Sequence, residues 1–158
     1  MTGESRSIDA YRKQKWGFMR VLSNWLASVS CWYDISKQRL IEICGRGEQP
    51  KKFKDMHLQL KNEEFAYAFI FELRNYSQHG GFPMTHWRIG GAWDKDFTQC
   101  TFSAIYALKY DDIRPFFENG RNQKERKEFG KKIEEYSEGE PIDLKPLIRQ
   151  SLCVLGRF

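Results

Sequence analysis

The sequence predicts a mainly α-helical protein that carries a small β-hairpin or extended excursion around residues 85–107. Apolar residues recur at every third or fourth position over much of the chain, which is the spacing of amphipathic helices. One segment departs from that spacing and is rich in Trp, Thr, Phe and Ile, which is typical of short strands. A length of 158 residues suits one domain, and a 15% share of aromatic residues supplies a core. We therefore expect a single helical domain over residues 1–158.

Two helices are predicted in the first third of the chain. The first covers residues 7–31, with Ser7 as its N-cap and an apolar stripe of helical period. The second covers residues 34–45, with Asp34 as its N-cap, and the Gly-Arg-Gly sequence that follows ends it. The lysine-rich residues after this turn are predicted to form a basic loop, up to about residue 55.

A third helix is predicted to begin between Met56 and Asn62 and to end at His79. Gly80 can adopt the left-handed conformation that closes a helix, and Pro83 cannot continue one. One face of this helix carries an apolar stripe: Phe65, Phe69, Leu73 and Tyr76. The end of the third helix is therefore clearly marked in the sequence.

A hairpin and two further helices are predicted in the second half of the chain. Two short extended runs predict the hairpin within residues 86–107. A charged helix is predicted over residues 121–136, and Asp143 is expected to cap a last helix over residues 144–158. That last helix has an apolar stripe and no stop signal. This raises two hypotheses: the chain is the N-terminal part of a longer protein, or the stripe packs on a second subunit.

The composition excludes several classes of protein. Aromatic residues make up 15% of the chain and charged residues 30%, which excludes disordered and low-complexity chains. No apolar run reaches the roughly 18 residues that span a membrane, and the first residues lack the apolar core of a signal peptide. We therefore expect a cytoplasmic protein without a membrane partner. The cysteines match no paired metal or redox spacing, and we expect reduced thiols in the core: Cys31, Cys44, Cys100 and Cys153.

The positive charge makes nucleic acid a candidate partner. The formal net charge is +5, and basic residues gather in three stretches, at 12–15, 50–54 and 121–132. A basic surface attracts polyanions through phosphate contacts and counterion release. Solvated faces of lysine-rich helices produce the same pattern, so charge alone leaves both interpretations open.

The end of the third helix gathers groups that could cleave RNA without a metal. In "LRNYSQH", Asn75 and His79 lie one turn apart on one face, and Arg74 is about 7.5 Å from His79 along the helix axis. An imidazole can take the proton of a ribose 2′-hydroxyl near neutral pH. An arginine can stabilise the phosphorane-like transition state, and an asparagine can orient the imidazole or hold a phosphate oxygen. A two-fold dimer that apposes two such helices would supply a second proton donor.

The stretch "LRNYSQH" resembles the signature of the HEPN family, the higher eukaryotes and prokaryotes nucleotide-binding domains. That signature is an arginine, a polar residue, a few variable positions and a histidine, and Arg74, Asn75 and His79 match it. The resemblance implies a helical bundle that dimerises through the motif-bearing helix. It implies an endoribonuclease that needs no metal or other cofactor and leaves 2′,3′-cyclic phosphate ends. Gln78 and Arg88 are weaker candidates for holding the RNA.

The resemblance also implies a biological setting and leaves an alternative open. Members of the family serve as toxins in toxin–antitoxin pairs and in anti-phage defence, so an antitoxin or other regulatory protein is a candidate partner. Other members have lost activity, and the chain could instead be a helical module that binds nucleic acid, a nucleotide or a protein. In that case the motif residues would make structural hydrogen bonds.

Two other kinds of site fit the sequence less well. A metal site built from His57, His86 and the cysteines matches no common zinc spacing. Aromatic residues of the predicted hairpin could stack on bases, although packing is their more frequent use: Trp87, Phe97, Phe102 and Tyr106.

Overall fold

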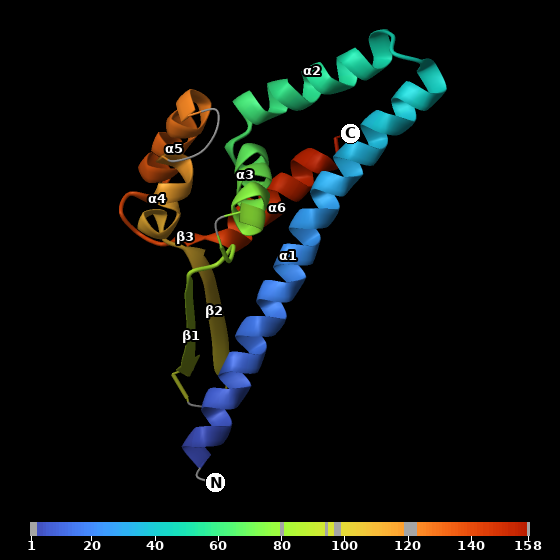
Figure 1. Ribbon diagram of the computed structural model, residues 1–158. Coiled ribbons are helices and arrows are strands. Elements are labelled where there is room, and N and C mark those ends of the chain that lie inside the picture. The colour runs from blue at the N-terminus through green and yellow to red at the C-terminus, as the bar shows by residue number, and fades with distance from the viewer. Residues whose placement is uncertain (1–2, 80, 94, 97–98, 119–122, 158) are drawn as a thin grey trace.

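The computed structural model describes residues 3–79, 81–93, 95–96, 99–118 and 123–157. In these ranges the chain is mainly helical and carries a small antiparallel sheet, as the sequence predicts (Figure 1). The described residues form six helices, one more than predicted. The helices are α1 (Gly3–Cys44), α2 (Glu48–Glu63), α3 (Phe65–His79), α4 (Tyr110–Glu118), α5 (Gln123–Ser137) and α6 (Leu144–Leu155). The strands are β1 (His86–Trp93), β2 (Cys100–Leu108) and β3 (Ile142–Asp143). None of the helices in these ranges is both long and apolar enough to cross a membrane.

Helix α1 is longer than predicted. It runs without a break through both of the predicted N-terminal helices, so neither Ser7 nor Asp34 is an N-cap. Residues 30–34 contain no glycine or proline that would end a helix, and Tyr33 packs against two aromatic rings of α2. Tertiary packing therefore carries the helix through the predicted break. The predicted end is confirmed, because Gly45 follows the helix with a φ of 71°.

The predicted basic loop is wrong, because these residues begin helix α2. Pro50 is tolerated in a first turn, and Lys52 pairs with Glu48 one turn away at 2.7 Å. The predicted third helix is divided, because Glu64 adopts an extended conformation between α2 and α3. No glycine or proline marks this break in the sequence. The break lets α3 enter the core while α2 keeps most of its residues at the surface.

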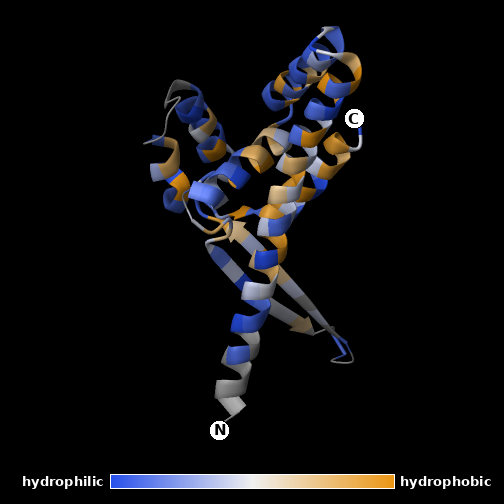
Figure 2. Ribbon diagram, turned by 45° about the vertical axis from the view of Figure 1, so that its right-hand side comes forward, coloured by the Kyte–Doolittle hydropathy of each residue, from blue (hydrophilic) through white to orange (hydrophobic). Residues whose placement is uncertain are grey.

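The core lies where α1, α3 and α6 meet. Hydrophobic residues gather there at the centre of Figure 2, whereas α2 and α5 are largely hydrophilic. Among the most deeply buried side chains are six from these three helices and β2: Leu26, Tyr67, Phe69, Leu108, Leu144 and Leu147. Helix α3 is buried from Ala66 to Phe71 and becomes exposed at Gln78 and His79. The fold therefore brings the C-terminal end of a core helix to the surface.

The predicted hairpin is present. Strands β1 and β2 pair along their whole length, and the hairpin projects away from the helical core (Figure 1). Phe18 of α1 stacks on Tyr106 of β2 with 3.8 Å between ring centroids, and Trp87 is buried. These two hairpin aromatics serve packing. Phe97 and the side chain of Phe102 lie outside the described residues.

The C-terminal third differs from the prediction in three features: helix α4, the short strand β3, and the end of α6, which stops at Leu155 before the predicted residue 158. Helix α4 is not predicted, and it buries Ile113 and Phe117 on one face. Helix α5 matches the predicted helix over residues 121–136, of which the first two lie outside the described ranges. The cap of α6 is confirmed, because Asp143 accepts a hydrogen bond from the backbone N–H of Lys145 at 3.1 Å.

The prediction of core cysteines is wrong for three of the four. Cys31, Cys44 and Cys153 are exposed, and the side chain of Cys100 lies outside the described part of the chain. Burial on a helix follows angular position, and these thiols lie on the outward sides of α1 and α6. The general tendency of free cysteine to be buried is therefore overruled by helical phase.

Candidate functional site

The predicted site lies at the C-terminal end of α3, where the helix leaves the core. The backbone N–H of Gly81 donates to the Tyr76 carbonyl oxygen at 3.1 Å, which is the bond of a Schellman-type helix end. Gly81 has a φ of 146°, and a Cβ there would lie 3.2 Å from the Tyr76 hydroxyl oxygen. Only glycine fits this position without strain. The predicted stop after His79 is therefore confirmed, although Gly80 itself lies outside the described residues.

Arg74 and Asn75 belong to a chain of polar contacts between α2 and α3. Arg74 Nη1 donates to Asn75 Oδ1 at 3.2 Å, and Asn75 Nδ2 donates to Glu72 Oε2 at 3.4 Å. Glu72 Oε1 in turn accepts from Lys61 Nζ at 3.1 Å. All four side chains are half-buried, so these bonds orient Arg74 and Asn75. Arg74 Nε is buried and has no partner within the described residues.

His79 is exposed and lines a pocket of about 370 Å³ at the end of α3. Ser23 contributes to this pocket from α1, and Gln78 and Phe82 come from either side of His79 in the chain. Gln78, one of the weaker candidates for holding RNA, therefore lies beside His79. An amide and a hydroxyl can bind base edges or phosphate oxygens, and the phenyl ring can stack on a base.

The other predicted residues lie outside this pocket. Asn75 lines a separate pocket of about 480 Å³ between α2, α3 and α5, together with Glu72. Arg88 lies on β1 and lines a third pocket of about 720 Å³ at the base of the hairpin. Arg74 and His79 are separated by about 7.5 Å along the axis of α3 and by about 140° around it. Within one chain, the predicted residues are thus distributed over three places.

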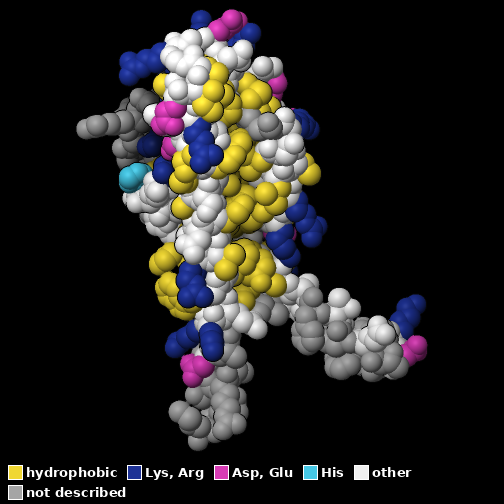
Figure 3. Space-filling model, turned by 90° about the vertical axis from the view of Figure 1, so that its right-hand side faces the viewer, with side chains coloured by type: hydrophobic (Ala, Val, Ile, Leu, Met, Phe, Trp, Pro, Cys, Tyr) yellow, Lys and Arg dark blue, Asp and Glu magenta, His cyan; other side chains and the backbone are white. Residues whose placement is uncertain are grey.

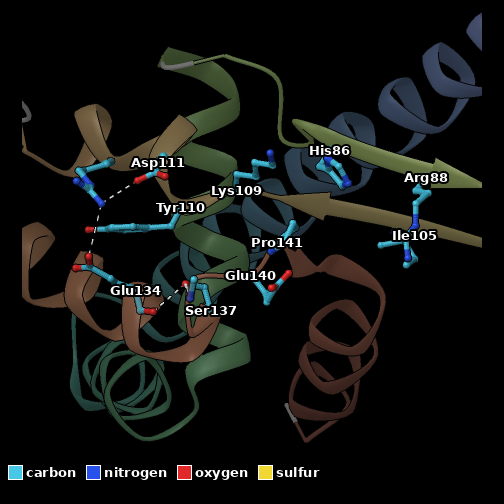
Figure 4. A pocket seen from close by; sticks show the side chains of 12 residues that line it. His86, Arg88, Ile105, Lys109, Tyr110, Asp111, Glu134, Ser137, Glu140 and Pro141 are labelled. Carbon is cyan, nitrogen blue, oxygen red and sulfur yellow. Dashed lines mark hydrogen bonds and ion pairs between the residues drawn. The ribbon is translucent and has the colours of Figure 1, made fainter.

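The pocket at the base of the hairpin has walls of opposite charge (Figure 4). His86 and Arg88 come from β1 on one side, and Glu134 comes from α5 on the other. Arg114 lies 2.8 Å from Asp111 Oδ1 and 3.6 Å from Glu134 Oε1, so its charge is already balanced. A phosphate chain is attracted less by such a mixed surface than by a uniformly basic groove.

His57, weighed above as a metal ligand, is buried between α2 and α3. Its Nδ1 lies 2.8 Å from the Tyr67 hydroxyl oxygen, and its ring stacks on Tyr33 with 4.0 Å between centroids. Burial, followed by the positive charge of Lys61, lowers the pKa of His57 to about 4. His57 is therefore a neutral packing residue. Within the described ranges, no cluster of three or more His, Cys, Asp or Glu side chains could hold a metal ion.

An exposed aromatic pair beside the His79 pocket is not predicted from the sequence. Phe82 is 55% exposed and Trp16 of α1 is 56% exposed. Their ring centroids lie 5.4 Å apart in an edge-to-face arrangement. In the sequence, Trp16 falls in the apolar stripe that predicts the first helix, and only the tertiary structure places it outside the core. The signal that could have found it is its spacing of four from both Arg12 and Arg20.

A fourth hollow is apolar and lies on the face that Figure 3 shows. Trp25, Trp32, Phe53 and Leu155 help to line a groove of about 810 Å³, and none of its described lining residues is titratable. Hydrophobic side chains gather along this face of α1 in Figure 3. Trp32 and Phe53 also meet edge to face, with 6.4 Å between centroids. Apart from the indole N–H groups of the two tryptophans, the only polar side-chain groups among its described lining residues are the hydroxyls of Ser28 and Ser36, so it offers no group for proton transfer near neutral pH and no positive charge for a phosphate.

The end of α3 therefore presents an accessible imidazole beside an amide, a hydroxyl and two exposed rings, whereas Arg74 and Asn75 are linked to a carboxylate. Comparison with protein-family models, with curated proteins and with solved structures found no match for this chain. Function is inferred below from the chemistry of these side chains.

Proposed function

We propose that this protein is a metal-independent endoribonuclease of the HEPN type, active in the cytoplasm as a homodimer. The observation that carries the proposal is an exposed imidazole, His79, about one and a half helical turns after a guanidinium, Arg74, at a helix end with a pocket. A role as a toxin or in anti-phage defence follows from the same resemblance, with an antitoxin or other regulatory protein as its partner.

His79 removes the proton from a ribose 2′-hydroxyl in the proposed reaction. The 2′-oxygen then attacks the adjacent phosphorus, the bond from phosphorus to the 5′-oxygen breaks, and the leaving oxygen takes up a proton. The products are a 2′,3′-cyclic phosphate and a free 5′-hydroxyl. Arg74 stabilises the negative charge that accumulates on the phosphorane-like state, and its bond to Asn75 orients the guanidinium.

A second copy of the chain completes the proposed site. Arg74 and His79 are offset by about 140° around α3, so one helix does not direct both side chains at a single phosphate. A two-fold dimer through α3 would set His79 opposite the partner's Arg74. The two histidines would then serve as base and acid on the same phosphate.

A non-catalytic helical module that binds nucleic acid, a nucleotide or a protein is the second candidate. The contact that favours it is the one between Asn75 and Glu72, whose carboxylate also accepts from Lys61. A half-buried carboxylate that already engages the motif repels a phosphate approaching Arg74. In this case Arg74 and Asn75 fasten α3 to α2, and the surface around His79 binds without cleaving.

Cleavage of a structured RNA in excess EDTA tests the proposal. The wild-type protein should cut and leave 2′,3′-cyclic phosphate ends, and His79→Ala should lower the rate at least about 100-fold. His86→Ala is the matched control, because His86 lies on β1 in a different pocket, and it should cut at the wild-type rate. Intact RNA in the presence of folded, dimeric wild-type protein would contradict the nuclease and favour the binding module.

A further inference from the structure

Phe82 is held at the surface by the residues on both sides of it. Gly81 closes α3 through its hydrogen bond to Tyr76, and Pro83 and Met84 are buried. Phe82 lies between these anchors and is 55% exposed. The loop therefore presents a ring to solvent in a fixed position, which is what a stacking surface for a base requires.

Trp16 extends this surface from α1. Its ring is nearly perpendicular to that of Phe82, at 80°, and it is 56% exposed. Edge-to-face contact covers one face of only one of the two rings, so at least one face of each ring lies outside the contact. The two rings form a corner in which one unpaired base can stack on one ring and turn its edge toward the other.

Two arginines flank Trp16 along the same side of α1. Arg12, Trp16 and Arg20 follow one another at intervals of four, and Ser23 continues this side to the His79 pocket. Arg12 and Arg20 are exposed, and neither forms an ion pair within the described part of the chain. The helix rises by about 17 Å from Arg12 to Ser23, which is the length of about five stacked nucleotides.

This combination of free cations and open rings identifies the ligand by its chemistry. We propose a binding track for single-stranded RNA that leads to His79 and is built from four exposed side chains: Arg12, Trp16, Arg20 and Phe82. Arginines contact the phosphates, and the rings stack on bases that a duplex would keep hidden. The track rests on the proposed function in taking RNA as the ligand, and it adds that the RNA is unpaired where it passes His79.

Fluorescence anisotropy with a labelled single-stranded 2′-O-methyl oligoribonucleotide of eight nucleotides tests the track. This probe lacks the attacking hydroxyl, so it is bound without being cut. Phe82→Ala and Trp16→Ala should each raise Kd about 5- to 100-fold, and Phe82→Tyr should bind like the wild type. Trp32→Ala is the matched control, because Trp32 lies on the same helix and meets Phe53 edge to face. It should leave Kd unchanged.

The cations and the strandedness of the ligand give independent readouts. Arg12→Gln and Arg20→Gln should each reduce the slope of log K against log salt concentration by about 0.7. A duplex of the same sequence should bind more weakly than the single strand. Single-stranded DNA of that sequence should compete no better than the RNA probe.

Four results would overturn the track: a wild-type Kd for Phe82→Ala, an equal loss in Trp32→Ala, duplex binding as tight as single-strand binding, or DNA that competes better than RNA. The nuclease can fail separately, if RNA stays intact while binding depends on Trp16 and Phe82. The track fails alone if Phe82→Ala cuts unpaired RNA with the wild-type kcat/KM. Melting curves check that each variant is folded. The variants at Trp16 and Phe82 should fold, because both rings are exposed.

Discussion

Two histidines on neighbouring helices show how the fold decides what one side chain can do. His57 of α2 is 8% exposed, contacts the Tyr67 hydroxyl at 2.8 Å and has its pKa lowered to about 4. His79 ends α3, is exposed and lines a pocket with Gln78. The first is a packing group that stays neutral, and the second is accessible to a ligand. Position on the helix therefore separates a structural histidine from a candidate for catalysis.

The largest effect is expected from replacing His79. His79→Gln should reduce RNA cleavage about 10²- to 10⁴-fold, because general acid–base catalysis is lost. The free energy of unfolding should change by less than about 0.5 kcal/mol, because the side chain is exposed. Cleavage rates and urea denaturation measure the two quantities. Cleavage by His79→Gln at the wild-type rate would contradict a catalytic role for His79 and so remove its functional distinction from His57.

The converse substitution should affect stability and leave chemistry intact. His57→Ala should lower the free energy of unfolding by about 2–4 kcal/mol, because it leaves a cavity beside Tyr33 and removes the hydrogen bond between His57 Nδ1 and the Tyr67 hydroxyl. Urea denaturation measures the loss, and the cleavage rate per folded molecule should stay constant. A loss below about 0.5 kcal/mol would argue against a packing role for His57.

The pH dependence of stability should report on His57. Because its pKa is about 4 in the folded protein and near 6.5 in the unfolded chain, the unfolded chain binds more protons between these values. The contribution of neutral His57 to the free energy of unfolding is fully present above pH 6.5. It declines by about 2–3 kcal/mol as pH falls toward 4. His57→Phe keeps a ring and cannot titrate, so its profile should be flatter in this window. Parallel profiles would mean that other groups set the acid sensitivity.

The smallest effect is expected from removing the Tyr67 hydroxyl, which contacts His57 Nδ1. Tyr67→Phe removes the hydroxyl from His57 Nδ1 and should cost about 1 kcal/mol of unfolding free energy. His57 should remain neutral at pH 6, because burial is the main cause of its low pKa. Denaturation and an NMR titration of the imidazole test the two statements. An imidazole that becomes charged at pH 6 in this variant would assign the low pKa to the hydroxyl.

The fold is predictable from the sequence where the signal is local. The stop after His79 and the cap at Asp143 are local, because turn and cap chemistry depends on a few adjacent residues. Prediction fails where distant contacts decide. Tyr33 packs on α2 and carries α1 past Asp34, and Glu64 breaks a helix without a glycine or proline.

The candidate site, like the fold, is predictable from the sequence only where the signal is local. The spacing of Arg74, Asn75 and His79 is visible in the sequence, but their separation into different places depends on where α2 and α5 pack against α3. The exposure of Trp16 is equally non-local, because an apolar stripe on a helix does not show which of its members the rest of the fold will cover. Sequence spacing thus identifies candidate residues, and packing decides how they are grouped.

The end of α3 has an electrostatic consequence for any anion that reaches it. The unpaired carbonyl groups of a last helical turn carry about half a negative charge, which repels phosphates, whereas helix N-termini attract them. A phosphate can bind beside His79 only where cations outweigh this field. Exposed cations on the neighbouring side of α1 that form no ion pair among the residues that the structure describes include Arg12 and Arg20. We therefore expect the proposed RNA ligand to approach His79 along α1 and not head-on along the axis of α3.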